Sequence, residues 1–422
     1  MAADFDIIVA GAGPAGMATA IALAGEGFAT ALVGEAGAPR DGRTVALLDG
    51  SVRFLTAIGV WERIAPDAAP MTHMRIVDAT GSLFRPPPVS FSSREIGLDA
   101  FGHNVENVRL VAHLAEAAAA RENLTLLPAR VAGFAATEEA ATVTLEDGRR
   151  IGARLAVGAE GRHSPLRRAA GIGTRTWAYP QTAVTAILAH ARDHGGASTE
   201  FHTRAGPFTL VPLPGRVSSL VWVNRPQDAE RLAALDDDSF ARAVEEQAQS
   251  LLGAMRVAGP RGAVPLSGMS PTALTARRLA LVGEAAHVFP PIGAQGLNLG
   301  LRDGAALHDA VVDARANGVD IGAARVLERF GRGRRVDTAL RTNAIDLLNR
   351  TLLADMLPAD LLRGAGLLTL GLIGPLRRAV MREGLTPGLN TPRQMRRPAR
   401  EGAGAGGAEM VSPMPDQHRN HA

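Results

Sequence analysis

The segment that most constrains the fold is a glycine-rich turn between an apolar strand and an alanine-rich helix near the amino terminus. Residues 5–10 (FDIIVA) predict a short buried strand, and the hexapeptide GAGPAG (11–16) leads into an Ala-rich stretch that predicts a helix. Residues 29–35 (ATALVGE) predict a second strand that ends in an acid. A strand, a helix and a strand in this order predict a parallel α/β sheet with helices on its faces.

Each glycine of this turn has a separate role in a dinucleotide-binding site. Gly11 permits the tight turn from strand to helix, Gly13 lets the backbone approach a pyrophosphate, and Gly16 allows the helix to pack on the strand. Glu35 follows Gly16 by 19 residues, and its carboxylate can accept both ribose hydroxyls, which disfavours a 2′-phosphorylated cofactor here. An incidental glycine turn is the alternative, and the motif does not distinguish FAD from NAD.

Two later segments also place a carboxylate and glycines after a predicted strand. Residues 158–167 (GAEGRHSPLR) follow a strand expected at 154–159, and residues 281–287 (LVGEAAH) precede the glycine-rich run 293–300 (GAQGLNLG). The carboxylate in the segment 281–287 can bind a sugar-alcohol hydroxyl. The amides of residues 296–298, at a helix N-terminus, can face a ring oxygen that becomes anionic on reduction.

Composition excludes several other kinds of site. The chain has no cysteine and no lysine, so all 45 of its basic residues are arginine. Thiolate nucleophiles, Fe–S clusters, Cys-ligated zinc and Schiff-base lysines are therefore excluded, and no metal-ligand framework is present. The sequence pI of about 10.5 at a net charge of only +3 reflects the scarcity of groups that titrate above neutral pH. We therefore expect no nucleic-acid partner.

The remaining pattern predicts interleaved domains. Strand-like pieces at 71–100 and again from about 181 to 270 interrupt the dinucleotide-type sequence, the latter including expected strands at 208–214 and 218–223. Further strands are expected at 129–134 and 142–145, with Asp147-Gly148 as a hairpin turn. A helix is expected over 107–121, and helices dominate from Leu301 onward.

Additional segments connect the sequence with one family. They are residues 41–47 (DGRTVAL), 105–107 (VEN), 179–181 (YPQ) and the highly specific block 293–303 (GAQGLNLGLRD). From about residue 5 to 390 the chain resembles the FAD-dependent aromatic hydroxylases of the para-hydroxybenzoate hydroxylase fold, and most of all the UbiH-like hydroxylases of ubiquinone biosynthesis. The resemblance implies a Rossmann-type FAD-binding domain interleaved with a β-sheet substrate domain, followed by C-terminal helices.

The expected domain boundaries follow from this resemblance and from the changes of pattern. The FAD-binding domain takes three parts and the substrate domain two, in the chain order 1–70 (FAD), 71–100 (substrate), 101–180 (FAD), 181–275 (substrate) and 276–345 (FAD). C-terminal helices are expected over 346–390 and a disordered tail over 391–422, where large apolar residues are few.

The resemblance also implies a set of cofactor-binding residues, and it names no catalytic side chain. The ADP half of FAD is assigned to Gly11, Gly13, Pro14, Ala15, Gly16 and Glu35, with Val131 beside the adenine. The pyrophosphate and the ribityl chain are assigned to Arg43, Asn107 and Glu284, and the isoalloxazine edge to Gly293, Gly296, Leu297 and Asn298. Glu160, Gly161 and Arg167 are implied to seat both FAD and the nicotinamide donor. The family usually has Asp at positions 160 and 284, so each longer Glu must retract or the cofactor must shift.

The reaction implied by the resemblance is hydroxylation of a polyprenylated phenol. NADPH, NADH or a redox partner reduces FAD, O₂ then forms a flavin C4a-hydroperoxide, and this species transfers a hydroxyl group to the ring. The alternatives are a flavin hydroxylase of another aromatic compound, a polyprenyl-lipid reductase, and a flavoprotein scaffold of a ubiquinone-synthesis complex. For His287 and Tyr179 a structural role is favoured over contact with reacting groups.

The expected location is cytoplasmic, with a peripheral contact to the inner membrane as the further hypothesis. Asp4 and Asp6 stand where a signal peptide has basic residues. The apolar run from Gly364 to Gly374 is far short of the roughly 20 residues of a membrane-spanning helix. Residues 351–379, apolar with arginines near the ends, predict either a core helix pair, which is favoured, or a membrane-facing lip for a prenylated substrate.

Overall fold

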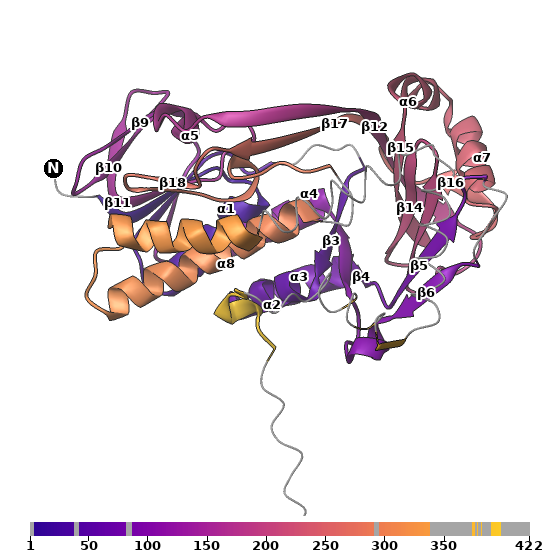
Figure 1. Cartoon of the computed structure of the whole chain (residues 1–422), viewed down its shortest axis with the longest axis horizontal. Helices are drawn as coiled ribbons and strands as arrows, with labels where there is room; N and C mark the ends of the chain where they lie inside the picture. The colour runs from indigo at the N-terminus through magenta and orange to yellow at the C-terminus, as the bar shows by residue number, and fades with distance from the viewer. Residues whose placement is uncertain are drawn as a thin grey trace, which may run out of the picture.

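A computed structural model describes residues 4–37, 42–81, 87–290, 295–337 and 390–397, with the single positions 374, 375, 378 and 381. Within these residues the strands form two eight-stranded sheets and one three-stranded sheet. Figure 1 shows the first sheet with helices α1 and α8 on the left and the second sheet on the right, joined along the top by the long strands β12 and β17.

The first sheet has the strand order β18-β19-β11-β1-β2-β8, with β10 paired to β11 and β9 paired to β10. Its strands are β1 (Phe5–Ala10), β2 (Thr30–Val33), β8 (Leu124–Leu127), β9 (Val131–Ala136), β10 (Ala141–Leu145), β11 (Arg150–Gly158), β18 (Thr275–Ala276) and β19 (Leu279–Leu281). β1 pairs in parallel with β2 and β11, and β11 with β19. The predicted parallel α/β sheet is therefore confirmed, as is the hairpin between β10 and β11, where Gly148 has a φ of +85°.

Alternate residues of these strands enter two separate cores. Ile7 and Val9 of β1 pack with α1 (Pro14–Gly25), α4 (Asn107–Ala119) and α8 (Gln295–Ala316). Ile8 and Ala10 pack on the opposite face with β9, β10 and α5 (Pro165–Ala169). Because successive side chains of a strand point to opposite faces, a strand covered on both sides reads as one apolar run, as residues 5–10 do.

The second sheet has the order β16-β12-β15-β14-β13-β5-β6, with β17 also paired to β12. Its strands are β5 (His73–Asp78), β6 (Val89–Ser92), β12 (Thr174–His190), β13 (Ala197–Thr203), β14 (Gly206–Leu213), β15 (Val217–Asn224), β16 (Met255–Val257) and β17 (Gly262–Pro271). Helices α6 (Pro226–Ala233) and α7 (Asp237–Gln247) cover one face of it. β5 and β6 thus join strands that begin about 100 residues later along the chain, since β5 pairs in parallel with β13.

A small sheet and several short helices complete the described chain. The three-stranded sheet has the order β3-β7-β4, formed by β3 (Thr44–Leu48), β7 (Gly102–Glu106) and β4 (Ala68–Pro70). The other elements are α2 (Asp49–Ala57), α3 (Trp61–Ile64), η1 (Ala65–Asp67), η2 (Ser93–Ile96), η3 (Gly283–Ala285), η4 (Arg393–Met395) and a helical stretch at 324–337. None of the described helices has both the length and the apolar character that a membrane span requires.

The expectation of disorder from residue 391 onward is wrong for residues 391–397. Met395 in η4 is buried, and Arg393 forms ion pairs with Asp309 and Asp313 on α8. One buried methionine and one arginine that pairs with two carboxylates hold this short segment. An average of hydropathy over the segment does not reveal these contacts. The other domain boundaries stay predictions, and most of the expected C-terminal helices at 346–390 lie outside the described residues.

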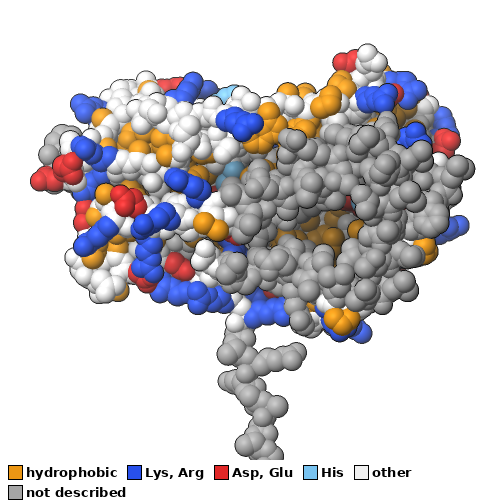
Figure 2. Space-filling model, viewed as in Figure 1, with side chains coloured by type: hydrophobic (Ala, Val, Ile, Leu, Met, Phe, Trp, Pro, Cys, Tyr) orange, Lys and Arg blue, Asp and Glu red, His pale blue; other side chains and the backbone are white. Residues whose placement is uncertain are grey.

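Figure 2 shows one surface of the molecule, on which arginine and acidic side chains are interspersed over the described part. Many of these charges form local pairs, such as Arg53 with Asp49 and Arg315 with Glu26. Exposed pairs of this kind contribute at most about 1 kcal/mol each, so the stability of the fold rests mainly on its apolar cores.

Candidate cofactor site and its motifs

The first glycine motif forms a tight turn between β1 and α1. Gly11 has a φ of +109°, and a Cβ added to it would lie 2.2 Å from the carbonyl oxygen of Ala159. A Cβ added to Gly16 would lie 1.9 Å from the carbonyl oxygen of Gly11, whereas one added to Gly13 would meet nothing within 4 Å. Gly11 and Gly16 are thus required by the protein itself, and the space beside Gly13, at the N-terminus of α1, suits a phosphate.

Pro14 and Ala15 begin helix α1 and bring it against the third motif. Proline at the first helical position lacks only an N–H that would have no partner within the helix. The Cβ of Ala15 would lie 3.2 Å from a Cβ added to Gly300 on α8. This close approach of α1 and α8 brings the first and third motifs together at the carboxyl ends of β1 and β19.

The predicted ribose and adenine contacts lie along the same edge of the sheet. Glu35 is exposed two residues after β2, whose carboxyl end lies beside that of β1. The N–H of Gly34 donates a hydrogen bond of 3.0 Å to the carbonyl of Leu127 at the end of β8, and Val131 follows at the start of β9. The fold therefore places Glu35, which follows β2, beside the end of β8, from which the chain leads to Val131, and this arrangement suits a bound adenosine.

Arg43 and Asn107 are neighbours although 64 residues separate them along the chain. β3 and β7 pair antiparallel from Thr44 opposite Glu106, and the N–H of Asn107 donates to the carbonyl of Arg43 over 3.1 Å. Arg43 is exposed and Asn107 is half-buried at the start of α4. An exposed guanidinium beside a helix N-terminus suits a pyrophosphate.

The second motif is built around a retracted carboxylate. Ser164 donates to Glu160 Oε2 over 2.7 Å and the N–H of Leu166 donates to Oε1 over 3.0 Å. Ser164 also caps α5 by accepting from the N–H of Arg167. The carboxyl group of Glu160 is therefore occupied in holding the start of α5. Gly161, with a φ of +81°, turns the chain away from β11.

Arg167 is a buried support of this turn. Its Nη1 donates to the carbonyl of Ala285 over 2.9 Å and its Nη2 to that of Arg162 over 2.5 Å. Arg167 thus connects the second motif with the third. Burial lowers the pKa of its guanidinium, against the opposing effect of the nearby Glu160 charge. A seating role for Arg167 toward FAD through these carbonyl contacts stays a prediction.

Glu160→Gln tests this arrangement through the pH dependence of stability. Burial raises the pKa of Glu160 above its ordinary 4.5, and the hydrogen bonds from Ser164 and Leu166 only partly oppose this. A raised carboxyl pKa stabilises the folded state below the unfolded pKa, and this contribution is lost as the pH rises through the folded pKa. We expect the stability of the wild type relative to Glu160→Gln to fall as the pH rises above about 4.5 and through the raised pKa of Glu160, measured by urea unfolding.

The control for this measurement is Glu146→Gln, because Glu146 is an exposed carboxylate at the β10–β11 turn. Its stability difference from the wild type should not fall across the same pH range. A constant difference between wild type and Glu160→Gln would show that the Glu160 carboxyl group is not held in a buried, readily protonated state.

The third motif places an exposed carboxylate opposite the second. Gly283, with a φ of +62°, begins the short helix η3 after β19, and the next residue, Glu284, is exposed. A Cβ added to Gly161 would lie 4.0 Å from Glu284 Oε2. Of these two acids, Glu160 is bound by protein groups, whereas Glu284 is exposed beside the second motif.

Gly293 lies outside the described residues, and the other three residues of its group begin α8. Gly296 is exposed with nothing within 4 Å of an added Cβ, and Leu297 is half-buried. The side chain of Asn298 instead faces the protein. Its Oδ1 accepts from the N–H of Leu48 over 2.9 Å and from Ser51 Oγ over 2.7 Å, and its Nδ2 donates to the carbonyl of Ala46 over 2.8 Å. Asn298 therefore ties the start of α8 to β3 and α2.

The two single residues for which a structural role is favoured are both bound to protein groups. The buried His287 is hydrogen-bonded through Nε2 to Asp303 over 2.6 Å, as expected for a packed histidine. Tyr179 accepts a hydrogen bond of 2.8 Å from Trp177 Nε1. His287 is thus bound to Asp303, which ends the block 293–303 and whose role no local pattern indicates.

A basic cavity of about 600 Å³ adjoins the second motif. It is lined by the motif residues Arg162, His163, Arg167 and Arg168, by the start of β12, and by Ser267 to Met269 of β17 and Val288. Three arginines around one cavity suit an anionic ligand. This concavity could not be predicted from the chain, because β12 and β17 come to the second motif only through the tertiary fold.

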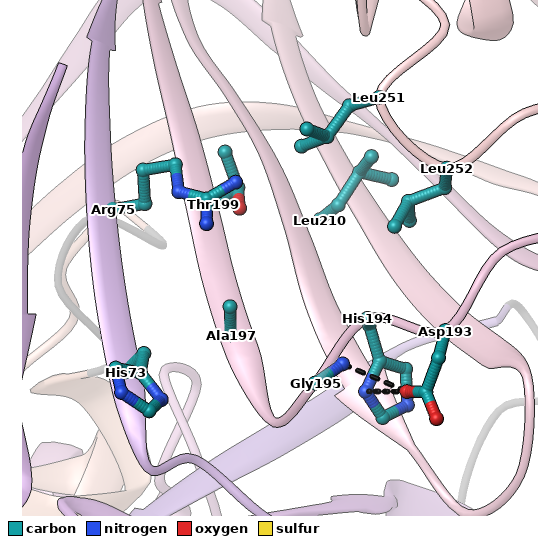
Figure 3. A pocket seen from close by; sticks show the side chains of 10 residues that line it. All are labelled: His73, Arg75, Asp193, His194, Gly195, Ala197, Thr199, Leu210, Leu251 and Leu252. Carbon is teal, nitrogen blue, oxygen red and sulfur yellow. Dashed lines mark hydrogen bonds and ion pairs between the residues drawn. The ribbon is translucent and has the colours of Figure 1, made fainter.

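Another cavity, of about 310 Å³, lies in the second sheet beside β5, β13 and β14. Figure 3 shows Leu210, Leu251 and Leu252 on one side of it and His194 and Asp193 on another. Asp193 accepts from the N–H of Gly195 over 2.7 Å and His194 Nε2 donates to the carbonyl of Leu213. These polar groups hold their own loop, and the lining residues belong to none of the three motifs, so this cavity is not the cofactor site.

The described residues fit FAD. Open space at Gly13 and Gly296 meets two helix N-termini, and the carboxylates of Glu35 and Glu284 are exposed. Two N-termini with open backbone can bind the pyrophosphate and the electron-rich edge of a flavin, and two carboxylates can accept hydroxyl groups of ribose and ribitol.

Sequence comparison relates this chain to known FAD-binding proteins. The FAD binding domain family matches residues 4–318. The ubiquinone hydroxylase UbiL of Rhodospirillum rubrum is 36% identical over 401 residues, which cover 93% of this chain and 92% of that protein. The 3-demethoxyubiquinol 3-hydroxylase of Escherichia coli is 29% identical, covering 90% of this chain and 98% of that protein.

Solved structures share the fold at much lower identity. The p-nitrophenol 4-monooxygenase PnpA of Pseudomonas putida covers 93% of this chain and 100% of its own, with a TM-score of 0.75 and 18% identity. Together with the three motifs, this likeness confirms the interleaved α/β architecture of the para-hydroxybenzoate hydroxylase fold. The chain belongs to the FAD binding domain family and, within it, to the FAD-dependent monooxygenases that include the ubiquinone hydroxylases.

Proposed function

We propose that this chain hydroxylates the aromatic ring of a polyprenylated phenol in ubiquinone biosynthesis, using O₂ and FAD. The observation that carries the proposal is the 36% identity with a ubiquinone hydroxylase over nearly the full length of both chains. When bound, FAD supplies the oxygen chemistry. The protein residues bind the cofactor, orient the ring and exclude water.

An apolar face of the second sheet favours the proposal of a prenylated substrate. Ser219 of β15 is hydrogen-bonded to Thr44 of β3 over 2.8 Å, so the odd-numbered residues of β15 face the FAD-binding part. Val223 on this face packs with Ala183 and Leu266. An apolar wall beside β3, which follows Arg43, suits an aromatic ring with a hydrocarbon tail and keeps water from the reacting groups.

The basic cavity at Arg162, His163 and Arg168 supports a nicotinamide nucleotide as electron donor. Its arginines can bind the phosphates of NADPH or NADH, and the exposed Arg162 and Arg168 are accessible from solvent. A redox partner protein is the alternative donor, and it would meet the same basic surface with acidic groups. The two are distinguished by whether the purified protein oxidises NADPH or NADH alone.

The test combines genetics with a matched pair of variants. A strain that lacks the gene should accumulate a ubiquinone precursor short of one hydroxyl group, detected by mass spectrometry of lipid quinones. Wild type and Glu230→Gln should restore ubiquinone, because Glu230 is an exposed carboxylate on α6. Glu284→Gln should restore it only in part, because the proposed ribityl ligand loses its charge.

Two other outcomes of this experiment would contradict parts of the proposal. An unchanged quinone pool in the deletion strain would contradict the proposed substrate and favour another aromatic compound or a prenyl-lipid reduction. Full restoration by a Glu284→Gln protein that purifies without FAD would contradict catalysis and favour a scaffold in a ubiquinone-synthesis complex. The precursor mass also identifies which hydroxylation is missing.

We further propose that the protein contacts the inner membrane peripherally, where a polyprenylated substrate resides. The supporting feature is the apolar stretch 351–379, most of which lies outside the described residues. Flotation with liposomes should carry the wild-type protein to the lipid fraction. Recovery of the protein only from the soluble fraction would contradict the membrane contact and leave the proposed chemistry intact.

A further inference from the structure

A buried cluster of charged side chains lies against the turn that carries Glu284. His287 and Asp303 are each 2% exposed in their side chains, and Arg334 is 3% exposed. Arg334 Nε donates to Asp303 Oδ1 over 2.6 Å, its Nη1 donates to Asp337 over 2.5 Å, and Arg302 donates to the same carboxylate over 2.7 Å. Two acids and two arginines thus balance in charge beneath a cofactor turn.

Asp303 holds both ends of this turn at once. Its Oδ2 accepts from the backbone N–H of Gly283 over 3.0 Å and is hydrogen-bonded to His287 Nε2 over 2.6 Å. The N–H of His287 also donates to the carbonyl of Gly283 over 3.0 Å, which closes the turn. Glu284 lies between the two held residues, so Asp303, together with the contact of Arg167 to the carbonyl of Ala285, fixes the backbone around Glu284.

The charge of Asp303 is what makes this link strong. Burial disfavours the ionised carboxyl group, but the charges and hydrogen bonds of His287 and Arg334 outweigh it, so the pKa of Asp303 lies below its ordinary value. Hydrogen bonds to an ionised acceptor are shorter and stronger than neutral ones. Asp337 in turn holds Arg334 against Asp303, and the opposite charges raise the pKa of Arg334 although its burial works against this.

The ring of His287 also contacts a residue farther along the chain. This ring is stacked on Phe289 with centroids 5.2 Å apart and planes at 25°. Among the described residues, Nδ1 of His287 has no hydrogen-bond partner. The bond from Nε2 to Asp303 is therefore the one that orients the ring.

We propose that Asp303 is a positioning residue for the cofactor, which acts by holding the Gly283–His287 turn so that the Glu284 carboxylate meets the ribityl chain of FAD. The proposal rests on the proposed role of Glu284 as a ribityl ligand. Asp303 itself is buried, and both of its carboxylate oxygens are bound to protein groups. Asp303 therefore affects FAD binding only by fixing the position of the turn. A residue that merely stabilises the fold would not change FAD affinity in this way.

The main variant is Asp303→Asn, and the chain offers a close match in Asp320→Asn. Asp320 likewise accepts from an arginine, Arg278 Nη2 at 2.6 Å, and from a glycine N–H, that of Gly322 at 3.2 Å. Arg278 precedes β19, however, whereas the Glu284 turn follows it, so Asp320 lies at the opposite end of that strand. Both variants lose a charged acceptor, and only Asp303→Asn loses the hold on the turn.

FAD affinity of the apo-protein is measured by flavin fluorescence quenching, together with urea unfolding of each apo-protein and the visible circular dichroism of bound flavin. We expect Asp303→Asn to weaken FAD binding about tenfold or more and to change the flavin dichroism. Asp320→Asn should lose less stability, because the Asp320 side chain is 37% exposed, and should leave FAD affinity unchanged. Equal FAD affinity of the two variants would overturn the proposal.

A double-mutant cycle separates this proposal from the role of Glu284 itself. If Glu284→Ala alone leaves FAD affinity unchanged, the ribityl role fails. If Glu284→Ala weakens FAD binding and Asp303→Asn then adds little, the positioning role holds; full additivity would overturn it.

His287→Phe, which keeps an aromatic ring but removes its bond to Asp303, serves as the probe where Asp303→Asn does not fold. It should weaken FAD binding in the same direction, and unchanged affinity would overturn the proposal.

Discussion

Gly16→Ala is expected to abolish FAD binding and to destabilise the apo-protein by about 3 kcal/mol. The added methyl carbon would lie 1.9 Å from the carbonyl oxygen of Gly11 and 3.1 Å from the Cβ of Ala159. The first obstacle is backbone of the β1–α1 turn and the second is the short side chain of the residue that follows β11, so neither can rotate away as the end of a long side chain can. Relief requires that α1 move off the sheet, which displaces its N-terminus from the pyrophosphate.

Gly13→Ala is the matched variant, because its methyl group would meet no protein atom within 4 Å and its φ of −79° suits alanine. We expect a loss of stability below about 1 kcal/mol, since Gly13 is the N-cap of α1 and alanine caps poorly. FAD affinity should nevertheless fall at least about tenfold, because the methyl group fills the space of the pyrophosphate. Gly25→Ala, also with nothing within 4 Å, is the control for both.

The measurements are urea unfolding of the apo-proteins and titration of each with FAD. Equal stability of Gly16→Ala and wild type would show that the β1–α1 contact is looser than the distances above indicate. Unchanged FAD affinity of Gly13→Ala would remove the first motif from the cofactor site.

Asn298→Leu is expected to destabilise the protein by about 3–5 kcal/mol and to leave it without FAD. Leucine has a similar size but leaves the N–H of Leu48, the hydroxyl of Ser51 and the carbonyl of Ala46 without their present partner. Each of these is a group of the β3–α2 segment, and Asn298 carries the first turn of α8. Without this tie, the amides of residues 296–298 lose their fixed position toward the flavin.

Asn224→Leu is the control, because Asn224 is equally buried but its side chain makes only a long bond of 3.4 Å to the carbonyl of Trp222. Its cost should be about 1 kcal/mol, with normal FAD content. Flavin content after purification and urea unfolding distinguish the two variants. A well-folded, fully flavinylated Asn298→Leu protein would contradict the tie between α8 and β3.

Local features were predictable from the chain because their physical causes are local. The apolar run 5–10 is a strand covered on both faces, and residues 107–119 form a helix through the spacing of Leu110 and Leu114. Asp147 and Gly148 close a hairpin because glycine accepts the positive φ of that turn. The cofactor family was also predictable, since its glycines and acids occur in short runs whose spacing reflects one turn each.

The roles of individual polar groups were less predictable, because a side chain's partners come from distant elements. Glu160 and Glu284 occupy similar motifs, yet Glu160 is bound to the start of α5 whereas Glu284 is exposed. Asn298 reads as a flavin contact in its glycine-rich run, but its side chain binds residues about 250 positions earlier. No local pattern distinguishes these cases.

The sequence alone therefore determined the βαβ opening, because a strand, a tight turn and a helix depend on neighbours within a few residues. The resemblance of its short motifs to one family also indicated the interleaved architecture and the FAD-dependent chemistry. Only the tertiary structure decided that Asp303 holds the Gly283–His287 turn and that Arg162 and Arg168 line a cavity with β12 and β17. These relations depend on the packing of helices and sheets far apart in the chain, where burial and exact distance decide which charges meet.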